Sequence, residues 1–191
     1  MKQVDPSLAP VETLEDVLSK RRSVRRYGAR ALSEDEILRL CWAAQGITDP
    51  AGYRTSPSAG ALYPLQLAVA TAAGLFVYDP PHHRLLRRTA DDLRAAIQGA
   101  APAQEAGGES PAVFVIIAVP ARTAAKYGSR AQRYVLLEAG HAAQNLLLEA
   151  TALDLGAVPV GAFDDARLHR VLDLPRGHDV LYLLPVGEPA E

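Results

Sequence analysis

Two N-terminal segments show the pattern of an amphipathic helix that begins at a polar cap. Thr13 stands three residues before Asp16, and Ser33 stands three residues before Glu36, a spacing typical of a capping box at a helix start. Apolar residues after Ser33 recur at helical spacing as far as Gly46, and glycine commonly ends a helix. We therefore expect a short helix after Thr13 and a second helix between Ser33 and Gly46.

Apolar runs farther along the chain predict strands. Residues 66–71 and 75–79 are short runs on either side of a glycine-containing turn, which is typical of a hairpin. The run at 113–119 is apolar at every position and predicts a central strand that is buried on both faces. Residues 157–163 predict a strand that enters a turn, and residues 181–187 predict the last strand.

The remaining periodic segments predict helices. Residues 91–99 form a short one, residues 129–155 form the longest one, and Asp164 stands where it would cap a last one. The long segment is apolar on nearly all of its faces, so we expect it to lie in a core or against a second subunit. A domain of about 190 residues has a limited interior, which favours a dimer interface over part of this helix.

Residues 47–64 separate the second helix from the first strand and are dense in glycine, proline, serine and threonine. This composition predicts a loop, and a loop of this length inside a compact domain is usually functional. Because no repeat or linker interrupts the pattern, we expect one domain over residues 1–191, with residues 1–12 as a flexible arm.

Composition narrows the class of protein. Of the 191 residues, 49% are hydrophobic and 22% are charged, and the net charge is -2. This balance is typical of a soluble globular protein and argues against general nucleic-acid binding, which usually needs a basic chain. No run approaches the length that spans a bilayer, and the acids and prolines near the N-terminus are unlike a signal peptide. We expect a cytoplasmic protein without membrane or nucleic-acid partners, and we expect Cys41 to be a buried structural residue rather than a nucleophile.

A basic segment around Ser23 is a candidate phosphate site. Arg21, Arg22 and Arg25 lie within four residues of one another, and guanidinium groups bind phosphate oxygens through paired hydrogen bonds. In a slightly acidic chain such a cluster suits one bound phosphate. A solvated basic turn is the alternative, and the pattern alone leaves both open.

Small residues mark two further candidate segments. Ser58 and Gly60 lie in a run at 56–64 in which the backbone could approach a flat ligand closely. At Gly161 and Ala162 a predicted strand ends before a helix cap, so backbone amides could point at an electron-rich ring atom. Ordinary structural turns are the alternative at both places.

Nearly the whole chain, between residues 20 and 188, carries motifs in a recognisable order: RRSVR, CWAAQGIT, RTSPSAGALYPLQL, then KYGSRAQRYVLLEAGHAAQNLLLEATALDLGAVPVGAFDD, and LLPVG. In sequence and spacing these motifs closely resemble the SagB-type dehydrogenases of the nitroreductase superfamily. The resemblance implies an α+β nitroreductase-like fold with a central, mostly antiparallel sheet flanked by helices. It also implies an intertwined homodimer with FMN bound at the subunit interface.

The resemblance further implies which residues bind the cofactor. The RRSxR motif would hold the phosphate and ribityl chain, the PSAG segment would lie along the flavin, and the turn at Gly161 would face flavin N5. Many nitroreductases have a glutamate at that turn, so an acidic side chain beside the flavin is missing here. The implied cofactor-binding residues are Arg21, Arg22, Ser23, Arg25, Pro57, Ser58, Ala59, Gly60, Leu62, Gln144, Gly161 and Ala162.

Lys126 and Tyr127 occupy the place where SagB-type enzymes that oxidise azoline rings carry a Lys-Tyr pair. In that family the pair would assist removal of a proton from the ring carbon while hydride passes to flavin N5. A lysine amine can act as a base and a tyrosine can relay a proton. We favour this catalytic role over an exposed pair at the start of a helix.

Other motifs are absent from the sequence. His141 shares a helix face with Glu138, but no HExxH motif or Cys/His set accompanies it. We therefore expect no metal site and a buried, hydrogen-bonded His141. The chain also lacks a P-loop, a G-x-S-x-G and a G-x-G-x-x-G motif, which argues against kinase, hydrolase and Rossmann functions.

The expected function is that of an FMN-dependent oxidoreductase of the SagB-type dehydrogenase and nitroreductase class, acting on a small molecule or a peptide. If the protein is a dehydrogenase of this type, its activity should depend on Lys126 and Tyr127. One alternative is a reductase of quinones or nitro compounds, which predicts rapid flavin reduction by NAD(P)H. A second alternative is a non-enzymatic flavin- or partner-binding module, which predicts bound FMN without turnover, or no FMN.

Overall fold

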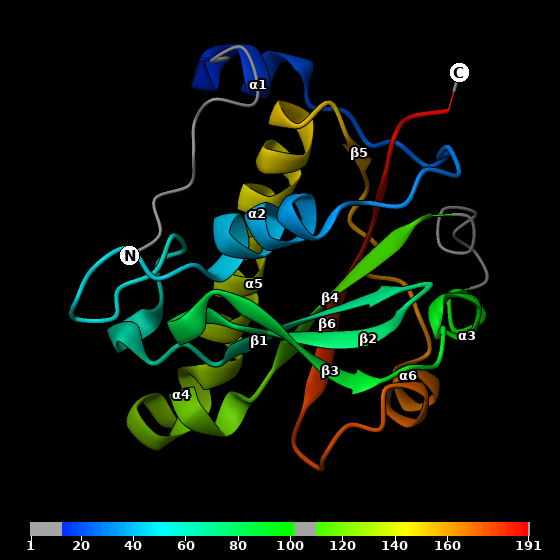
Figure 1. Ribbon diagram of the computed structural model, residues 1–191. Coiled ribbons are helices and arrows are strands. Elements are labelled where there is room, and N and C mark those ends of the chain that lie inside the picture. Colours follow the sequence, from blue (N-terminus) through cyan, green and yellow to red (C-terminus); the bar gives the residue numbers. More distant parts are fainter. Residues whose placement is uncertain (1–12, 102–109, 191) are drawn as a thin grey trace.

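A six-stranded antiparallel sheet forms the centre of the protein. The computed structural model describes residues 13–101 and 110–190, so the arm expected at residues 1–12 lies outside the described residues. The strand order is β3-β2-β1-β4-β6-β5, and every neighbouring pair is antiparallel. Helices lie on both sides of this sheet (Figure 1), which confirms the expected α+β class.

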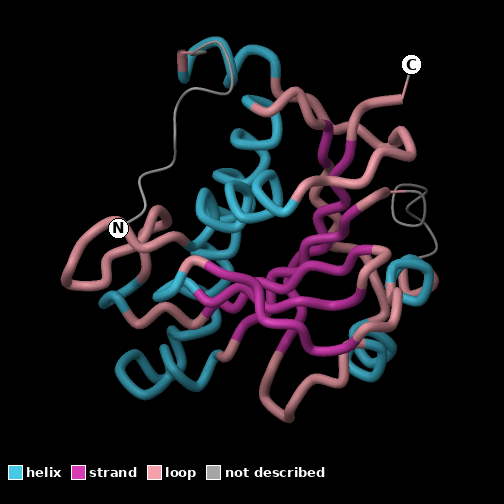
Figure 2. Tube along the Cα trace, in the orientation of Figure 1, coloured by secondary structure: helices cyan, strands magenta, loops and turns pink. Residues whose placement is uncertain are grey.

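Three consecutive strands, β1 to β3, follow the first two helices, and the other strands are separated by helices. Figure 2 shows the strands gathered at the centre with helices around them. The strands are β1 (Leu65–Thr71), β2 (Gly74–Asp79), β3 (Arg84–Thr89), β4 (Ala112–Ala118), β5 (Gly156–Ala157) and β6 (Asp179–Gly187). The helices are α1 (Leu14–Lys20), α2 (Glu34–Gln45), α3 (Arg94–Gln98), α4 (Pro120–Tyr127), α5 (Ala131–Ala152) and α6 (Asp165–Val171). Single 3-10 turns are η2 (Ala59–Ala61), η3 (Pro80–His82) and η4 (Gly128–Arg130).

Strand β4 is buried at every position, as its unbroken apolar run predicts. Successive side chains of a strand point to opposite faces of the sheet. Phe114 therefore joins a core with residues of α2 and α5, while Val115 joins a second core with residues of α3 and α6. The sheet thus separates two hydrophobic layers, and the long helix α5 covers one of its faces.

The chain after β4 differs from the sequence-based expectation. It does not lead straight into the longest helix but first forms α4, which begins at Pro120 and ends before Gly128. Proline in the first turn and glycine after the last residue are common helix boundaries. Lys126 and Tyr127 therefore lie in the last turn of α4 and not at the start of a helix, as the alternative to a catalytic role had them.

The strand expected at residues 157–163 is shorter than predicted. Pro159 has no N–H group to donate to a sheet ladder, and β5 covers only Gly156–Ala157. Pairing with β6 resumes at Val160, whose N–H donates to the carbonyl of Leu183 at 2.8 Å. Gly161 lies exposed beyond this point, where the chain turns toward α6.

Candidate functional site

The basic segment (residues 21–26) runs extended between β5 and the chain that follows β6. The N–H of Val24 donates to the carbonyl of Ala157 at 3.0 Å, and the N–H of Ala190 donates to the carbonyl of Arg26 at 3.0 Å. The segment is therefore held from both sides by backbone hydrogen bonds, so its path does not depend on its side chains.

Tyr27 anchors the basic segment from the protein interior. The side chain is buried, and its hydroxyl lies 3.1 Å from the carbonyl oxygen of Pro185 and 2.5 Å from that of Val24. Burial raises the pKa of this phenol, so the hydroxyl stays protonated and remains a donor. Gly156 lets the segment approach β5, because a Cβ there would lie 2.6 Å from Val24 Cβ.

The arginines of the basic segment have different surroundings. Arg22 bends back over the end of α1, where its Nη1 donates to the carbonyls of Ser19 at 3.0 Å and Arg21 at 2.8 Å. The side chains of Arg21 and Arg25 make no hydrogen bond or ion pair with residues 13–101 or 110–190. Together with the exposed Ser23, these two guanidinium groups can bind an external anion.

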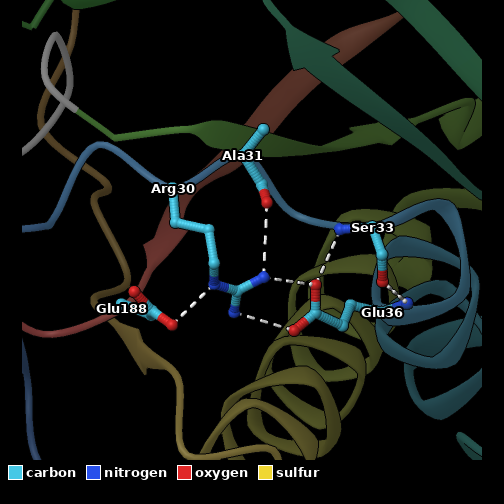
Figure 3. A network of polar contacts seen from close by, with 5 residues as sticks. All are labelled: Arg30, Ala31, Ser33, Glu36 and Glu188. Carbon is cyan, nitrogen blue, oxygen red and sulfur yellow. Dashed lines mark hydrogen bonds and ion pairs between the residues drawn. The ribbon is translucent and has the colours of Figure 1, made fainter.

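Arg30 fixes the chain just after the basic segment to α2 and to the end of β6 (Figure 3). Its Nε donates to Glu188 Oε1 at 2.6 Å, and its Nη1 and Nη2 donate to the two oxygens of Glu36 at 3.0 and 2.9 Å. Glu36 also accepts the N–H of Ser33 and so completes the capping box of α2. Hydrogen bonds from Arg30 lower the pKa of Glu36.

The small-residue loop (residues 56–64) has an unusual backbone. Gly60, Ala61 and Tyr63 have φ values of 64°, 53° and 45°, and this left-handed region is unfavourable for residues other than glycine. Ser58 stabilises the conformation, since its carbonyl accepts the N–H of Ala61 at 3.0 Å and its Oγ accepts the N–H of Tyr63 at 2.9 Å. Backbone strain of this kind concentrates at functional sites.

Helices α2, α5 and α4 hold the two ends of this loop. Asn145 of α5 donates to Ser56 Oγ at 3.2 Å, and the buried Ser56 hydroxyl donates to the carbonyl of Ala44 in α2 at 2.8 Å. At the other end, Arg122 of α4 donates to the carbonyl of Tyr63 at 3.1 Å. The loop is therefore fixed by side chains from elements that are far apart in sequence.

The structure brings Lys126 and Tyr127 against the middle of the small-residue loop. A Cβ on Gly60 would lie 2.9 Å from Tyr127 Oη and 3.1 Å from Lys126 Nζ. The ring of Tyr127 packs edge-on against Tyr134 of α5, with centroids 5.0 Å apart. An amine and a phenol thus lie beside a backbone that has no side chain to cover it.

Glu138 is a site residue whose importance the sequence analysis missed. It lies on α5, is only 2% exposed, and burial raises its pKa to about 7, although hydrogen bonding with Ser58 and the charge of Arg54 act in the opposite direction. A single acid within the apolar stretch of residues 135–139 is the signal that could have found it. His141 is exposed, so its predicted burial is wrong.

The basic segment and the small-residue loop lie on different sides of one chain. In Figure 1 the blue chain after α1 crosses the upper right of the molecule, whereas the cyan loop after α2 extends to the left. Gln144 is exposed on α5, and Gly161 and Ala162 are exposed after Val160.

The described parts of the chain hold no group of His, Cys, Asp or Glu suited to a metal ion. They also hold no helix that is long and apolar enough to span a membrane.

Comparisons with known proteins place nearly the whole chain in one family. The model of the nitroreductase family matches residues 18–188. A protein of Methanocaldococcus jannaschii described as a nitroreductase is 41% identical over 184 residues, which is 93% of this chain and 92% of the relative. A nitroreductase crystal structure from Ralstonia eutropha superposes with a TM-score of 0.87 at 27% identity, over 98% of this chain and 88% of that one.

A chain of the Escherichia coli microcin synthetase complex has the same fold, with a TM-score of 0.77 at 21% identity over 100% of this chain and 79% of that one. An identity this low shows the fold alone. The family match extends over nearly all of the described residues, and the fold agrees with it. The chain belongs to the nitroreductase family of oxidoreductases.

Proposed function

We propose that the protein is an FMN-dependent oxidoreductase in which Lys126 and Tyr127 act on the substrate. When bound, FMN supplies hydride transfer through its N5 atom. The observation that carries the proposal is that Tyr127 Oη and Lys126 Nζ lie 2.9 and 3.1 Å from where a Cβ of Gly60 would be, because this places a candidate base and a candidate proton relay beside a residue without a side chain. Nitroreductase-family proteins generally use FMN with NAD(P)H, which supports this cofactor.

The residues present fit a flavin phosphate and ring. Arg21 and Arg25 have no anionic partner among the described residues, and with Ser23 they offer the donors that a phosphate needs. The small-residue loop, including Pro57, Ser58, Ala59, Gly60 and Leu62, would lie along the ring. Backbone amides at Gly161 and Ala162 would face its reactive edge, and Gln144 would reach the cofactor from α5.

The proposed site needs two copies of the chain. One copy holds the basic segment and the small-residue loop on different sides (Figure 1), so a single ligand that uses both would draw them from two chains. Leu136 and Leu137 support such an assembly, because they are 50% and 52% exposed on the outer face of α5. We propose a homodimer with the flavin between subunits.

Two substrate classes fit this site. Placement of Lys126 and Tyr127 together supports a dehydrogenase of the SagB type, in which the lysine amine removes a proton from a ring carbon and Tyr127 passes it on. Membership in the family and the Methanocaldococcus relative support an NAD(P)H-dependent reductase of nitro compounds or quinones. In that case the same pair would donate a proton to the reduced product.

An anaerobic absorbance titration tests the proposal. Purified protein is loaded with FMN, freed of excess, and mixed with NADH or NADPH. Bound flavin that bleaches supports the reductase, whereas bound flavin that resists bleaching supports substrate-driven dehydrogenation. Protein that retains no flavin would contradict the proposal and favour a non-enzymatic module.

Lys126→Ala distinguishes a catalytic role from a binding role. We expect this variant to keep stoichiometric FMN and to lose about a hundredfold or more of its turnover, since a positioned acid or base contributes about 10²–10⁴-fold to rate. The matched control is Arg130→Ala, which removes an exposed cation just beyond α4. Unchanged turnover of Lys126→Ala would remove this lysine from the mechanism.

A further inference from the structure

A small cavity, the fork cavity, lies where strands β1 and β2 separate from each other. β1 pairs with β4 over its whole length, but its pairing with β2 ends at Ala68 and Val77. β2 continues alongside β3 as far as Asp79. The facing backbone groups of residues 65–67 and 78–79 therefore have no strand partner across the gap among the described residues. Buried backbone groups are normally paired, so such groups favour a polar occupant between the strands.

The fork cavity has a volume of about 230 Å³ and an apolar side to its wall. This side is formed by Leu65, Leu67, Val77, Pro80 and Leu86. A cavity of about 150 Å³ is enough to hold a benzene ring, so the fork cavity has room for a ring with one further group. An apolar wall with a few polar groups that fix orientation is typical of a site for a small molecule.

Two arginines give the fork cavity a positive charge. Arg54 lines it from the loop before β1 and Arg122 lines it from α4, and neither forms an ion pair with residues 13–101 or 110–190. Burial lowers the pKa of the Arg54 guanidinium, and the like charge of Arg122 lowers it further, whereas the charge of Glu138 acts in the opposite direction. An anion in the cavity would offset the repulsion between the two guanidinium groups.

Side-chain donors at the fork cavity also lack acceptors. Arg54 Nη1 donates to Gln45 Oε1 at 2.7 Å, but Arg54 Nε and Gln45 Nε2 are buried and have no hydrogen-bond partner within the described ranges. Gln45 is 2% exposed and lines the cavity together with Arg54. A buried donor without a partner costs free energy. Because both unpaired groups are donors, they favour an occupant that accepts hydrogen bonds.

Asp79 is the acid of the cavity wall, and it favours one kind of anion over another. Its Oδ2 accepts the Nε–H of Arg84 at 2.9 Å and lies 2.8 Å from His82 Nδ1. The charge of Arg84 therefore offsets part of the charge of this carboxylate. What remains repels a doubly charged phosphate more than a singly charged carboxylate, so the cavity suits a carboxylate on an apolar ring.

We propose that the fork cavity is a binding site for a ring that carries a carboxylate, and that it holds the carboxylate end of the substrate. The role in substrate binding rests on the proposed function. Arg122 and Lys126 stand four residues apart on α4, so they share one side of the helix and lie about 6 Å apart along its axis. Arg122 donates to the carbonyl of Tyr63 at 3.1 Å, while Lys126 lies beside Gly60. This spacing suits a ring with the carboxylate at one end and the reacting group at the other.

Benzoate and benzamide test the site in protein without flavin. They share one ring, but only benzoate is charged at neutral pH. In ¹H–¹⁵N correlation spectra we expect benzoate to shift the backbone amides of Gln66 and Asp79, which line the fork cavity. Benzamide should bind about tenfold more weakly or worse, since a hydrogen bond to a charged group contributes about this factor.

Arg122→Gln should lose about tenfold in affinity for benzoate and little in affinity for benzamide. Arg176→Gln is the matched control, because Arg176 is exposed in the loop before β6 and does not line the cavity. This control should bind both probes as the unaltered protein does. An equal loss of both probes in Arg122→Gln would show that Arg122 only supports the small-residue loop.

Leu86 gives a second test, in which no side-chain hydrogen bond is removed. This residue is 43% exposed on β3 and lines the fork cavity. Leu86→Glu should weaken benzoate binding by about two- to fivefold through repulsion, and the effect should fade at high salt. Leu86→Gln, with a neutral side chain of the same shape, should change the binding of benzoate and benzamide equally. Equal weakening of benzoate by both variants would contradict an anion in the cavity.

4-Nitrobenzoate tests the link between the fork cavity and the candidate active site. It carries a nitro group at the end of the ring opposite the carboxylate. We expect it to shift the amides of Gln66 and Asp79, as benzoate does, and to shift the amides of Gly60 and Tyr127 in addition. This measurement needs neither flavin nor turnover.

The possible failures are distinguishable. Benzoate that leaves Gln66 and Asp79 unshifted, or that binds no better than benzamide, refutes the carboxylate site. 4-Nitrobenzoate that shifts the fork but leaves Gly60 and Tyr127 unshifted refutes the role in substrate binding. A protein that binds no FMN or shows no turnover refutes the proposed function, while the spectra of the flavin-free protein still decide whether the fork cavity binds a carboxylate.

Discussion

Gly60 is the residue at which the backbone conformation and the proposed chemistry meet. Its φ of 64° lies in the left-handed region, where a side chain costs about 1–2 kcal/mol. A side chain there would also displace the amine of Lys126 and the hydroxyl of Tyr127. Gly60→Ala should therefore lose about 1–2 kcal/mol of stability together with most of the turnover.

Gly52 supplies the matched control for that prediction. Its φ is 87°, but a Cβ there would meet nothing within 4 Å. Gly52→Ala should thus lose a similar amount of stability in urea denaturation while keeping its turnover. Equal activity of the two variants would show that the contact of Gly60 with α4 has no catalytic consequence.

The raised pKa of Glu138 also predicts how stability depends on pH. The folded protein binds this proton more tightly than the unfolded chain does, so the stabilisation is complete below the unfolded value near 4.5 and is lost as pH rises through about 7. Glu138→Gln removes this dependence. Relative to the unaltered protein it should gain up to about 2 kcal/mol at about pH 8, a figure reduced for partial screening, and gain little at about pH 5. Urea denaturation at both pH values checks this, and a constant difference would contradict it.

Sequence reasoning identified the chemistry of several site residues but not their neighbours. Lys126, Tyr127 and Gly60 were each singled out, yet only the packing of α4 against the small-residue loop brings them together. Glu138 and His141 share a helix face in the sequence pattern, but α5 buries the acid and exposes the imidazole. Which face of an almost wholly apolar helix turns inward is decided by tertiary packing, which periodicity cannot supply.

At the scale of elements, the hydrogen bonds of Arg30 to Glu36 and Glu188 link the basic segment to α2 and to the end of β6 (Figure 3). Arg30→Lys keeps the charge but loses the planar fork that matches both oxygens of Glu36. The side chain is 42% exposed, so we expect a loss of only about 0.5–1 kcal/mol in urea denaturation near neutral pH.

The pH dependence of this loss has the opposite sign to that of Glu138. Arg30 lowers the pKa of Glu36, so this stabilisation is present above the unfolded glutamate value and is lost as pH falls through the folded one. The difference between Arg30→Lys and the unaltered protein should therefore shrink in acid. Arg26→Lys, an exchange at an exposed arginine of the same segment, should show no such difference at any pH.

The boundaries of the helices and strands show which local sequence signals were enough to predict them. Capping boxes at Thr13 and Ser33 predicted the starts of α1 and α2, and both are formed. The apolar pattern does not predict α4, although Pro120 and Gly128 mark its ends, because the stronger apolar pattern of α5 follows it almost directly. The apolar run predicts a longer β5 than the structure has, because Pro159 cannot donate to the sheet and interrupts the pairing.

At the scale of the whole molecule, the proposed site is complete only in an assembly, and α5 offers the surface for it. Leu137 is 52% exposed in the first half of this helix. A charged side chain at the centre of an apolar interface is strongly unfavourable, whereas on a free surface it costs little. Leu137→Glu should therefore remain folded, become monomeric in sedimentation experiments, and lose bound FMN because each copy then holds only part of the site.

Leu86 of β3 distinguishes this effect from a general response to surface charge. It is 43% exposed, and Leu86→Glu places the same carboxylate on β3, an edge strand of the sheet. This control should keep both the oligomeric state and the flavin of the unaltered protein. If Leu137→Glu stayed dimeric and kept its FMN, the outer face of α5 would not be the interface, and the basic segment would have to meet its ligand without a loop from a second chain.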